Sequence, residues 1–300
     1  FWRRTGDAWS AREQEIRDSM WGSNPGTRGE GWELWSQAQI GGERLGGVQD
    51  FTVLGQTFTP NLRTDTDWRG FQAGADTLHG NWLWGLTGGF LEQNTIFHAD
   101  RNSLDMTGWN FGGYGGFTSG HFFLNGLVKG DWFEVKSNMP TVPAYETFNG
   151  NDWGAKAETG FRIGGAGLYF EPVADISWTS THLDNAGFQN VSTTFSFGDS
   201  STTRGSIGAR AGAQWGSILP YIGIYAVDEW DSNAKVTMVT GSGCPSCISI
   251  DDVRPGSYGK ADLGFTTTSW NGLEGFVKVE DEFGSHVDGF IGRLGVRWRW

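Results

Sequence analysis

The sequence has few cysteines, few basic residues and no long apolar run, and each shortage excludes a class of protein. Only 37% of the 300 residues are hydrophobic, and nowhere do about 18 apolar residues follow one another, which excludes a helical membrane protein. Two cysteines, Cys244 and Cys247, are too few for a scaffold dense in disulfides. Because 34 acidic residues outnumber 22 basic ones, giving a net charge of −12, no nucleic-acid partner is expected.

Glycine and aromatic residues, by contrast, are abundant, with 48 glycines, 17 tryptophans and an aromatic content of 15%. Glycine follows no Gly-X-Y repeat, which excludes collagen, and so many aromatic residues exclude a disordered chain. Apolar residues scattered this evenly are typical of an outer-membrane β-barrel. The chain opens at Phe1 without a basic and apolar leader, so we expect it to be the C-terminal part of a longer protein.

One segment near the N-terminus is predicted to be helical. Ala8–Met20 contains no glycine or proline and is rich in alanine, arginine, glutamate and glutamine, which are good helix formers. We expect Thr5 or Asp7 to cap its start, and Gly22 with Pro25 to end it. A helix with charge on most of its faces cannot enter a hydrophobic core, so it is either solvated or enclosed in a polar tube.

After Gly29 the apolar residues recur at every second position, which is the period of a β-strand. The last segment shows this best, with three arginines on one face and, on the other, Phe290, Leu294, Val296, Trp298 and Trp300. Twelve such segments are predicted, at residues 31–43, 67–77, 81–93, 104–118, 121–134, 151–164, 167–182, 201–215, 218–230, 256–268, 272–282 and 289–300. The fold predicted is a 12-stranded antiparallel transmembrane β-barrel.

The connections and the tryptophans support a barrel over a soluble β-sandwich. Connections after even-numbered strands are tight, whereas five of the six after odd-numbered strands are long, as in bacterial outer-membrane barrels. Tryptophans gather near both ends of the predicted strands, where the two membrane interfaces would lie. The set near the short turns is Trp82, Trp215, Trp270, Trp298 and Trp300, and the set near the long loops is Trp132, Trp153, Trp178 and Trp230.

At this point the chain resembles the β-domain, or translocator, of the autotransporters, the type V secretion family. The resemblance covers nearly all of the chain and depends on the order and spacing of motifs that are individually weak. They are a polar helix followed by Gly31-Trp32-Glu33-Leu34-Trp35, then residues 70–76 (GFQAGAD), 110–115 (NFGGYG), 169–174 (YFEPVA) and 204–212 (RGSIGARAG).

The resemblance implies a monomeric barrel in the outer membrane of a Gram-negative bacterium, in contact with outer-membrane lipid. It also implies a passenger domain, covalently linked upstream of Phe1, that is exported to the cell surface. Residues 1–30 would form a linker helix in the lumen, and residues 31–300 the translocator barrel. A 12-stranded barrel is wide enough for one helix of about 10–12 Å diameter.

Charges on the helix and on the predicted lumen wall could hold the helix in place, or could simply solvate a wet lumen. The helix carries Arg12, Glu13, Glu15, Arg17 and Asp18. The wall positions, taken from the alternation, are Lys156, Glu158, Glu171, Asp175, Arg210, Glu274, Lys278, Glu280, Arg293, Arg297 and Arg299. The sequence does not show which of these charges pair.

Two departures from the family pattern bear on function. Members that release their passenger inside the pore carry an Asn-Asn pair in the helix, whereas the first asparagine here is Asn24, so self-cleavage is not expected. The chain ends in Trp300, where the family more often ends in phenylalanine. An aromatic end after alternating apolar residues still implies recognition by the barrel-assembly machinery, through Phe290, Leu294, Val296, Trp298 and Trp300.

Catalysis, metals and cofactors receive little support from the sequence. His182 with Asp184, or His286 with Asp288, could serve a surface hydrolase, but no nucleophile or zinc motif accompanies them. Cys244 and Cys247 lie in the longest outer loop and are predicted to form a small disulfide. We therefore expect no enzyme and no cofactor; the alternatives to a translocator are a porin with an incidental N-terminal helix and, more remotely, a barrel hydrolase.

Overall fold

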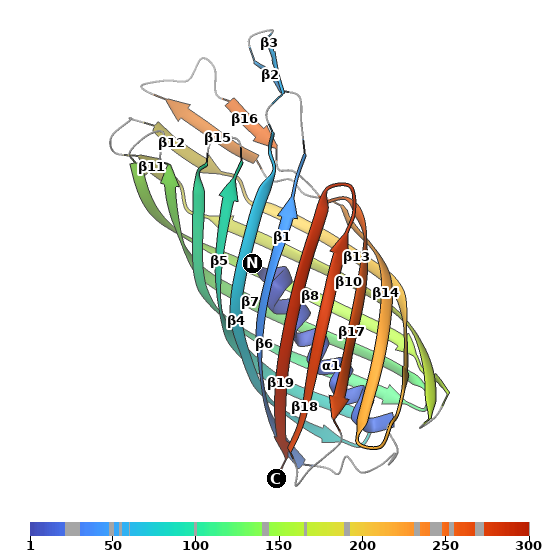
Figure 1. Cartoon of the computed structure of the whole chain (residues 1–300). Coiled ribbons are helices and arrows are strands. Elements are labelled where there is room, and N and C mark those ends of the chain that lie inside the picture. The colour runs from blue at the N-terminus through green and yellow to red at the C-terminus, as the bar shows by residue number, and fades with distance from the viewer. Residues whose placement is uncertain are drawn as a thin grey trace.

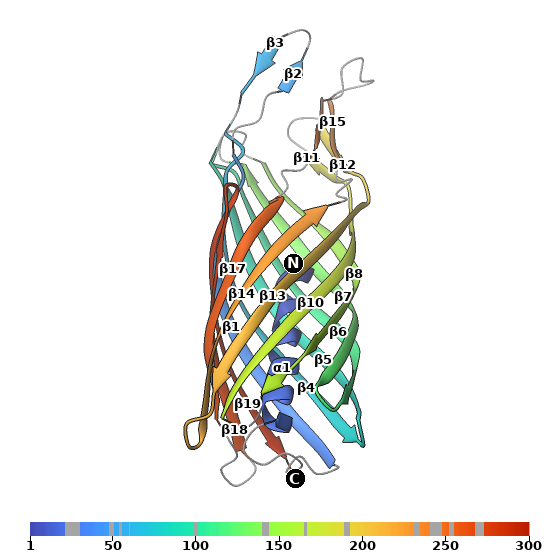
Figure 2. The ribbon, with the colours of Figure 1, turned by 90° about the vertical axis from the view of Figure 1, so that its right-hand side faces the viewer.

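The computed structural model describes residues 1–21, 31–47, 51–53, 56–59, 61–98, 101–139, 144–164, 167–188, 193–230, 235–240, 248–251, 255–267 and 273–299. It is a closed antiparallel β-barrel with one helix, α1 (Trp2–Trp21), in its lumen (Figures 1 and 2). No helix within those ranges combines the length and the apolar character that a membrane crossing requires.

The main sheet holds thirteen strands, of which β9 (Ile163–Gly164) is a two-residue extension, so twelve long strands form the wall. Each long strand pairs with the long strands before and after it in the chain, including β10 with β13. The first strand, β1, pairs with the last, β19, and this pairing closes the barrel. The twelve are β1 (Gly31–Leu45), β4 (Thr64–His79), β5 (Trp82–Phe97), β6 (Ser103–Ser119), β7 (Phe122–Met139), β8 (Ala144–Phe161), β10 (Leu168–Leu183), β13 (Ser200–Ala213), β14 (Ile218–Trp230), β17 (Ser257–Thr267), β18 (Leu273–Phe283) and β19 (Val287–Arg299).

Side chains alternate between the outer face and the lumen, because successive residues of a strand point to opposite sides of the sheet. In β19, Leu294 is 59% exposed on the outside, whereas Arg293 and Arg297 are buried within. The fold class predicted from the sequence, a 12-stranded barrel with an N-terminal helix, is confirmed. The strands extend two to seven residues further than predicted at several outer ends, as in β8, which begins at Ala144.

Apart from the turn between β18 and β19, the short connections lie at the end of the barrel where the C-terminus lies (Figure 1). Gly80, Gly120 and Gly216 have φ between +57° and +58° in these turns, a conformation that favours glycine. At the other end, three of the segments predicted as loops contain further strands. These are the hairpin β2 (Phe51–Val53) and β3 (Gln56–Phe58), and a four-stranded sheet of β11 (Ala186–Phe188), β12 (Thr193–Phe197), β15 (Lys235–Thr240) and β16 (Ile248–Asp251).

The helix begins earlier than predicted, at Trp2, so Thr5 and Asp7 lie inside its first two turns and do not cap it. Their side chains bond to the barrel wall: the Thr5 hydroxyl lies 3.2 Å from Asp131, and Asp7 pairs with Arg204 at 2.6 Å. Tertiary contacts therefore override the local preference of threonine and aspartate for a cap. Gly22 and Pro25, the expected end signals, lie outside the described residues.

The helix runs from the middle of the barrel toward the end with the short turns, as both views show (Figures 1 and 2). Its C-terminal end therefore leads to the start of β1, at the same end as the C-terminus of the chain. Its N-terminal end points toward the side of the long loops. Any chain joined ahead of Phe1 would continue from that inner position toward the outer mouth.

The lumen helix as candidate functional site

The helix has only a narrow apolar stripe, in which Trp9 and Ile16 pack against Leu78, Leu83 and Leu127 of the wall. Its charged side chains are nevertheless buried as well. The five that the sequence singled out, Arg12, Glu13, Glu15, Arg17 and Asp18, all lie inside the barrel. Charged groups cannot be removed from water without partners except at a large free-energy cost. The site is therefore defined by which wall side chains meet each of them.

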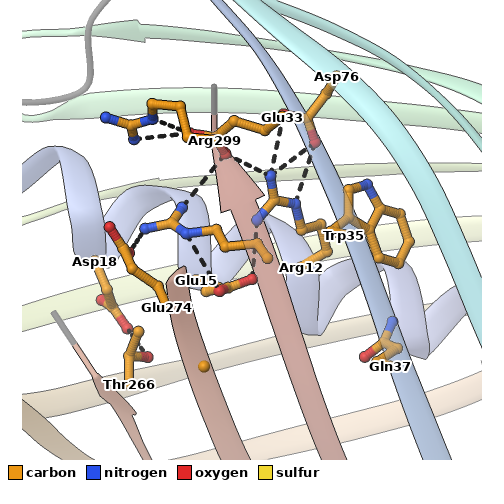
Figure 3. A network of polar contacts seen from close by, with 12 residues as sticks. Arg12, Glu15, Asp18, Glu33, Trp35, Gln37, Asp76, Thr266, Glu274 and Arg299 are labelled. Carbon is orange, nitrogen blue, oxygen red and sulfur yellow. Dashed lines mark hydrogen bonds and ion pairs between the residues drawn. The ribbon is translucent and has the colours of Figure 1, made fainter. Parts of the chain in front are cut away.

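Arg12 has the densest set of partners, near the middle of the helix (Figure 3). Its guanidinium donates to both carboxylate oxygens of Asp76 on β4, at 2.9–3.1 Å, and to Glu33 on β1 at 2.8 Å. A third carboxylate, that of Glu15 one turn along the helix, accepts a hydrogen bond of 2.9 Å. A planar guanidinium suits such a site because its donors are fixed in a fork that matches carboxylates.

The Asp76 carboxylate is itself held in place by aromatic side chains of the wall. The Tyr114 hydroxyl donates to Asp76 at 2.7 Å, and the Trp35 indole N–H donates to the Tyr114 oxygen at 2.8 Å. The Tyr114 ring lies over Gly85, where a Cβ atom would overlap it. The sequence analysis missed Asp76, Glu33 and Tyr114, although all three belong to motifs quoted for the resemblance and fall on the inward side of the alternation.

A second cluster surrounds the last charged residues of the helix. Arg17 donates to Glu158 at 2.7 Å and lies 3.5 Å from Glu171. Asp18 accepts hydrogen bonds from Arg162 at 2.7 Å and from Arg210 at 3.0 Å. Both of these arginines also bond to Glu171. The structure thus brings two of the predicted wall residues, Glu171 and Arg210, into direct contact with the helix.

Between these clusters, the C-terminal strand contributes Arg297. Its guanidinium lies 3.5 Å from Glu15 and 3.6 Å from Glu33, and it also pairs with Glu274 (Figure 3). Glu33 accepts a further hydrogen bond of 2.7 Å from Arg299. Because β19 and β1 are neighbours that complete the barrel, these pairs connect the helix to the junction between the first and last strands.

The first turns of the helix make a third set of contacts, which the sequence analysis did not anticipate because it placed them outside the helix. Asp7 pairs with Arg204 at 2.6 Å and with Lys156 at 3.0 Å. Arg4 pairs with Glu43 and with Glu282, and its guanidinium lies 3.9 Å from the centre of the Trp68 ring. Cation–π contacts of this kind suit arginine in a partly dry site.

The remaining predicted wall residues lie in the lumen but do not contact the helix directly. Lys278 pairs with Asp262 at 2.7 Å and Glu280 at 3.2 Å, and Arg293 lies 3.5 Å from Glu280. Asp175 accepts a hydrogen bond from Ser206 and lies 3.6 Å from Lys156. The contacts of Lys278, Glu280 and Arg293 run along β17, β18 and β19, and those of Asp175 run along β8, β10 and β13. Glu13, on the helix, is buried close to the wall at Gly116.

The residues weighed for other roles lie apart from the lumen. Phe290, Leu294, Val296 and Trp298 are exposed on the outer face, and Trp300 is outside the described residues, as are Cys244 and Cys247. His182 contacts Asp199 at 2.6 Å and Asp184 at 3.8 Å, all with exposed side chains, and His286 contacts Ser285. Within the described part of the chain, no three histidine, cysteine or acidic side chains are grouped to hold a metal ion.

Such buried ion pairs contribute little net stability, because desolvation offsets most of their attraction. Their effect is on specificity: a helix that is shifted or removed would leave carboxylates and guanidiniums buried without partners, at a cost of about 3–5 kcal/mol for each broken pair. The lumen therefore selects one position for the helix. Of the two interpretations left open by the sequence, direct pairing with the wall is the one these contacts support.

Comparison with known proteins decides the family. The family model described as Autotransporter beta-domain matches residues 51–280, which is most of the chain. The chain belongs to the autotransporter β-domain family. No curated protein sequence matches it. As a member of this family, the chain is a translocator domain of the Gram-negative outer membrane, in agreement with the prediction.

Solved structures of translocator domains have the same fold as this autotransporter β-domain. The transport unit of AIDA-I from Escherichia coli superposes with a TM-score of 0.70 at 18% identity, covering 96% of this chain and 97% of that one. The translocator domain of NalP from Neisseria meningitidis gives 0.71 at 12%, covering 99% and 96%. The β-domain of BrkA from Bordetella gives 0.65 at 16%, covering 90% and 100%. At these identities the likeness concerns the fold.

Proposed function

We propose that the helix is the tether between the barrel and a passenger domain encoded upstream of Phe1, and that it stays in the lumen after the passenger has reached the cell surface. Residues 1–30 then form the linker and residues 31–300 the membrane-embedded translocator. The observation that carries this proposal is the series of ion pairs along the whole helix, from Arg4 to Asp18. A helix that merely passed through would not need partners at every turn.

The direction of the helix supports the same proposal. Its N-terminal end faces the outer mouth and its C-terminal end leads to β1 at the opposite end of the barrel (Figure 2). A polypeptide that continues upstream of Phe1 thus leaves the lumen on the side of the long loops. The linker would hold the passenger at the outer surface while anchoring it inside the barrel.

We propose that the helix, paired with the wall along its length, also closes the pore to ions. Arg12 and its carboxylate partners on β1 and β4 lie near the centre of the barrel. Asp18 lies nearer the short turns, where it accepts hydrogen bonds from Arg162, directly after β8, and from Arg210 on β13. Removing the helix would leave a wide lumen lined with these charges, because the wall keeps its own hydrogen-bonded ladder.

We propose further that the domain performs no chemistry and leaves the passenger uncut. The segment Trp2–Trp21 contains no asparagine, the residue on which cleavage inside the pore depends in the relatives that the sequence resembles. His182, the best placed histidine, contacts carboxylates whose side chains are more than half exposed, so water competes for the proton on its ring.

As partners we propose outer-membrane lipid and the barrel-assembly machinery, with the barrel acting as a monomer. The apolar outer face supports contact with lipid, and its tryptophans lie at both ends: Trp82 and Trp298 near the short turns, Trp132 and Trp153 nearer the long loops. The exposed apolar face of β19, ending in an aromatic residue, supports recognition by the assembly machinery.

The test of this function is the conductance of single barrels in planar bilayers, with and without residues 1–28. We expect the whole chain to be nearly closed and the shortened chain to open steadily. If both conduct alike, the helix does not fill the lumen, and a porin becomes the better interpretation.

A further inference from the structure

The inner wall changes character beyond the N-terminal end of the helix. Around the helix the wall is mostly charged, apart from an apolar patch of Leu78, Leu83 and Leu127 against the helix. Toward the outer mouth β7 and β8 contribute a second buried apolar cluster, Phe133, Val135 and Phe148, joined by Ala186 of the β11–β12 hairpin. Half-buried Met106 and Phe197 pack at its edge. We call these six residues the exit surface. Its half-buried members present apolar atoms to the lumen.

The wall is shaped to hold this cluster. The Phe133 ring lies against Gly150 of β8 and its Cβ atom against Gly108 of β6, so a Cβ atom at either glycine would overlap Phe133. Phe148 stacks on Phe197 with 5.3 Å between ring centroids, which fixes the β11–β12 hairpin against the barrel wall. The exit surface is therefore built from two distant parts of the chain, the wall of β6–β8 and an outer loop.

The first residue of the chain already lies on this surface. The Phe1 ring stacks on Phe133, with centroids 5.0 Å apart and an interplanar angle of 29°. Phe1 precedes the first turn of the helix, and the helix points its N-terminal end toward the mouth (Figure 1). A polypeptide extending upstream from Phe1 would therefore leave along the apolar side of the lumen.

The opposite side of the lumen is charged at this level. Glu229 of β14 and Glu43 of β1 both pair with Arg3, and Arg204 of β13 pairs with Asp7. These groups already hold the helix, and a polypeptide that followed this wall would have to displace water from them or pair with them. On the β6–β8 side, Asp131 and Asp152 lie near the amino group of Phe1, and beyond them the route passes the apolar cluster, which carries no such requirement.

We propose that the exit surface binds the residues directly upstream of Phe1, and that this segment carries apolar or aromatic side chains on the side that faces β6–β8. This proposal rests on the proposed function, since it requires a passenger joined ahead of Phe1. The barrel would then bind the polypeptide at two places, through ion pairs along the helix and through apolar contacts at the exit surface. It holds the emerging polypeptide to one side of the mouth, next to the β11–β12 hairpin.

Cysteine crosslinking in the full-length protein, displayed on cells with its native passenger, tests this binding. Cys244 and Cys247 are first replaced by serine. One cysteine is placed about three to six residues upstream of Phe1, within about 10–20 Å of extended chain. A second is placed at Met106 or Phe197 on the exit surface, or, as the matched control, at Glu229 on the charged side. Oxidant is added after export, and the disulfide yield is read from gel mobility.

We expect the yield with Met106→Cys and Phe197→Cys to exceed the yield with Glu229→Cys by about two- to tenfold, the preference that aromatic contacts give. In the Met106→Cys background, Phe197→Gln should lower the yield by about two- to fivefold, whereas Asp199→Asn, an exposed change near the same hairpin, should leave it unchanged.

Surface exposure of the passenger, measured by protease digestion of intact cells, separates the two proposals. If the passenger of the parent protein is not exposed, the proposed function fails. If the passenger is exposed but Glu229→Cys crosslinks as well as Met106→Cys, or Phe197→Gln changes nothing, the exit surface does not bind the upstream segment.

Discussion

At the scale of single residues, Arg12 decides whether the helix stays in the lumen. Its replacement in Arg12→Met leaves Glu15, Glu33 and Asp76 buried close together without their shared cation. We expect the helix-bound state to lose about 3–5 kcal/mol, or at least about a hundredfold in occupancy. Single-channel recording should therefore show frequent openings of a barrel that is otherwise closed.

Arg69→Met is the matched control for Arg12→Met, since Arg69 pairs with Glu92 on the outer face and is largely exposed. Exposed pairs are worth less than about 1 kcal/mol, so this variant should remain as closed as the parent. A barrel that stays closed after Arg12→Met would show that the carboxylates find other partners and that Arg12 does not hold the helix.

Gly85 leaves space for the Tyr114 ring, whose hydroxyl donates a hydrogen bond to Asp76. A Cβ atom at this position would overlap that ring. Gly85→Ala should destabilise the barrel by about 1–3 kcal/mol through overpacking. Gly113→Ala is the control, since its Cβ would meet nothing closer than 3.7 Å. Thermal unfolding, followed by the gel shift between folded and unfolded barrel, should fall for the first variant and not for the second.

The sequence predicts which face of the barrel wall a side chain lies on, but it does not predict which residue that side chain pairs with. The alternation along a strand shows which face a side chain takes, so Arg210 and Arg297 could be assigned to the lumen from the sequence. It contains no information on which strand lies across the lumen, and so the partners Asp18 and Glu15 could not be assigned. Asp76 and Tyr114 were missed for a related reason: an isolated carboxylate or hydroxyl on an inward face looks the same whether or not it contacts the helix.

At the scale of elements, the helix depends on the barrel for its structure. It has 20 residues, a narrow apolar stripe that only the barrel wall covers, and Gly6 near its start, so an isolated helix gains little from propensity or packing. A synthetic peptide of residues 1–28 should be mostly unfolded in buffer by circular dichroism. Added to barrels that lack these residues, it should restore the closed state.

The same peptide with Arg12→Met and Asp18→Asn should close the pore poorly, because it retains the length but loses both central sets of pairs. Equal closure by both peptides would mean that bulk alone blocks the lumen.

The dependence of the helix on the barrel also explains the error in the predicted helix start. Local sequence rules predict a cap at Thr5 or Asp7. In the structure both residues lie within the helix, because their side chains pair with the wall residues Asp131 and Arg204.

At the scale of the whole molecule, the strands of the barrel were predictable because each carries its own period of two and its own turn signals. The outer sheet was not, because it pairs segments of two separate loops, Thr193–Phe197 with part of Lys235–Thr240. No local pattern specifies such a pairing. The exit surface escaped prediction for the same reason, since it combines strands β6–β8 with a hairpin more than 40 residues away from Phe133.

The orientation of the molecule in the membrane follows from its two kinds of connection, and single cysteines can test it. After Cys244 and Cys247 are replaced by serine, a cysteine at exposed Asp199 lies on the side of the long loops, and one at exposed His121 lies in a short turn. A maleimide that cannot cross the membrane should label Asp199→Cys in intact cells, and His121→Cys only after the cells are permeabilised. Labelling in the reverse order would place the N-terminal end of the helix toward the periplasm, and a passenger joined to it could not reach the surface by this route.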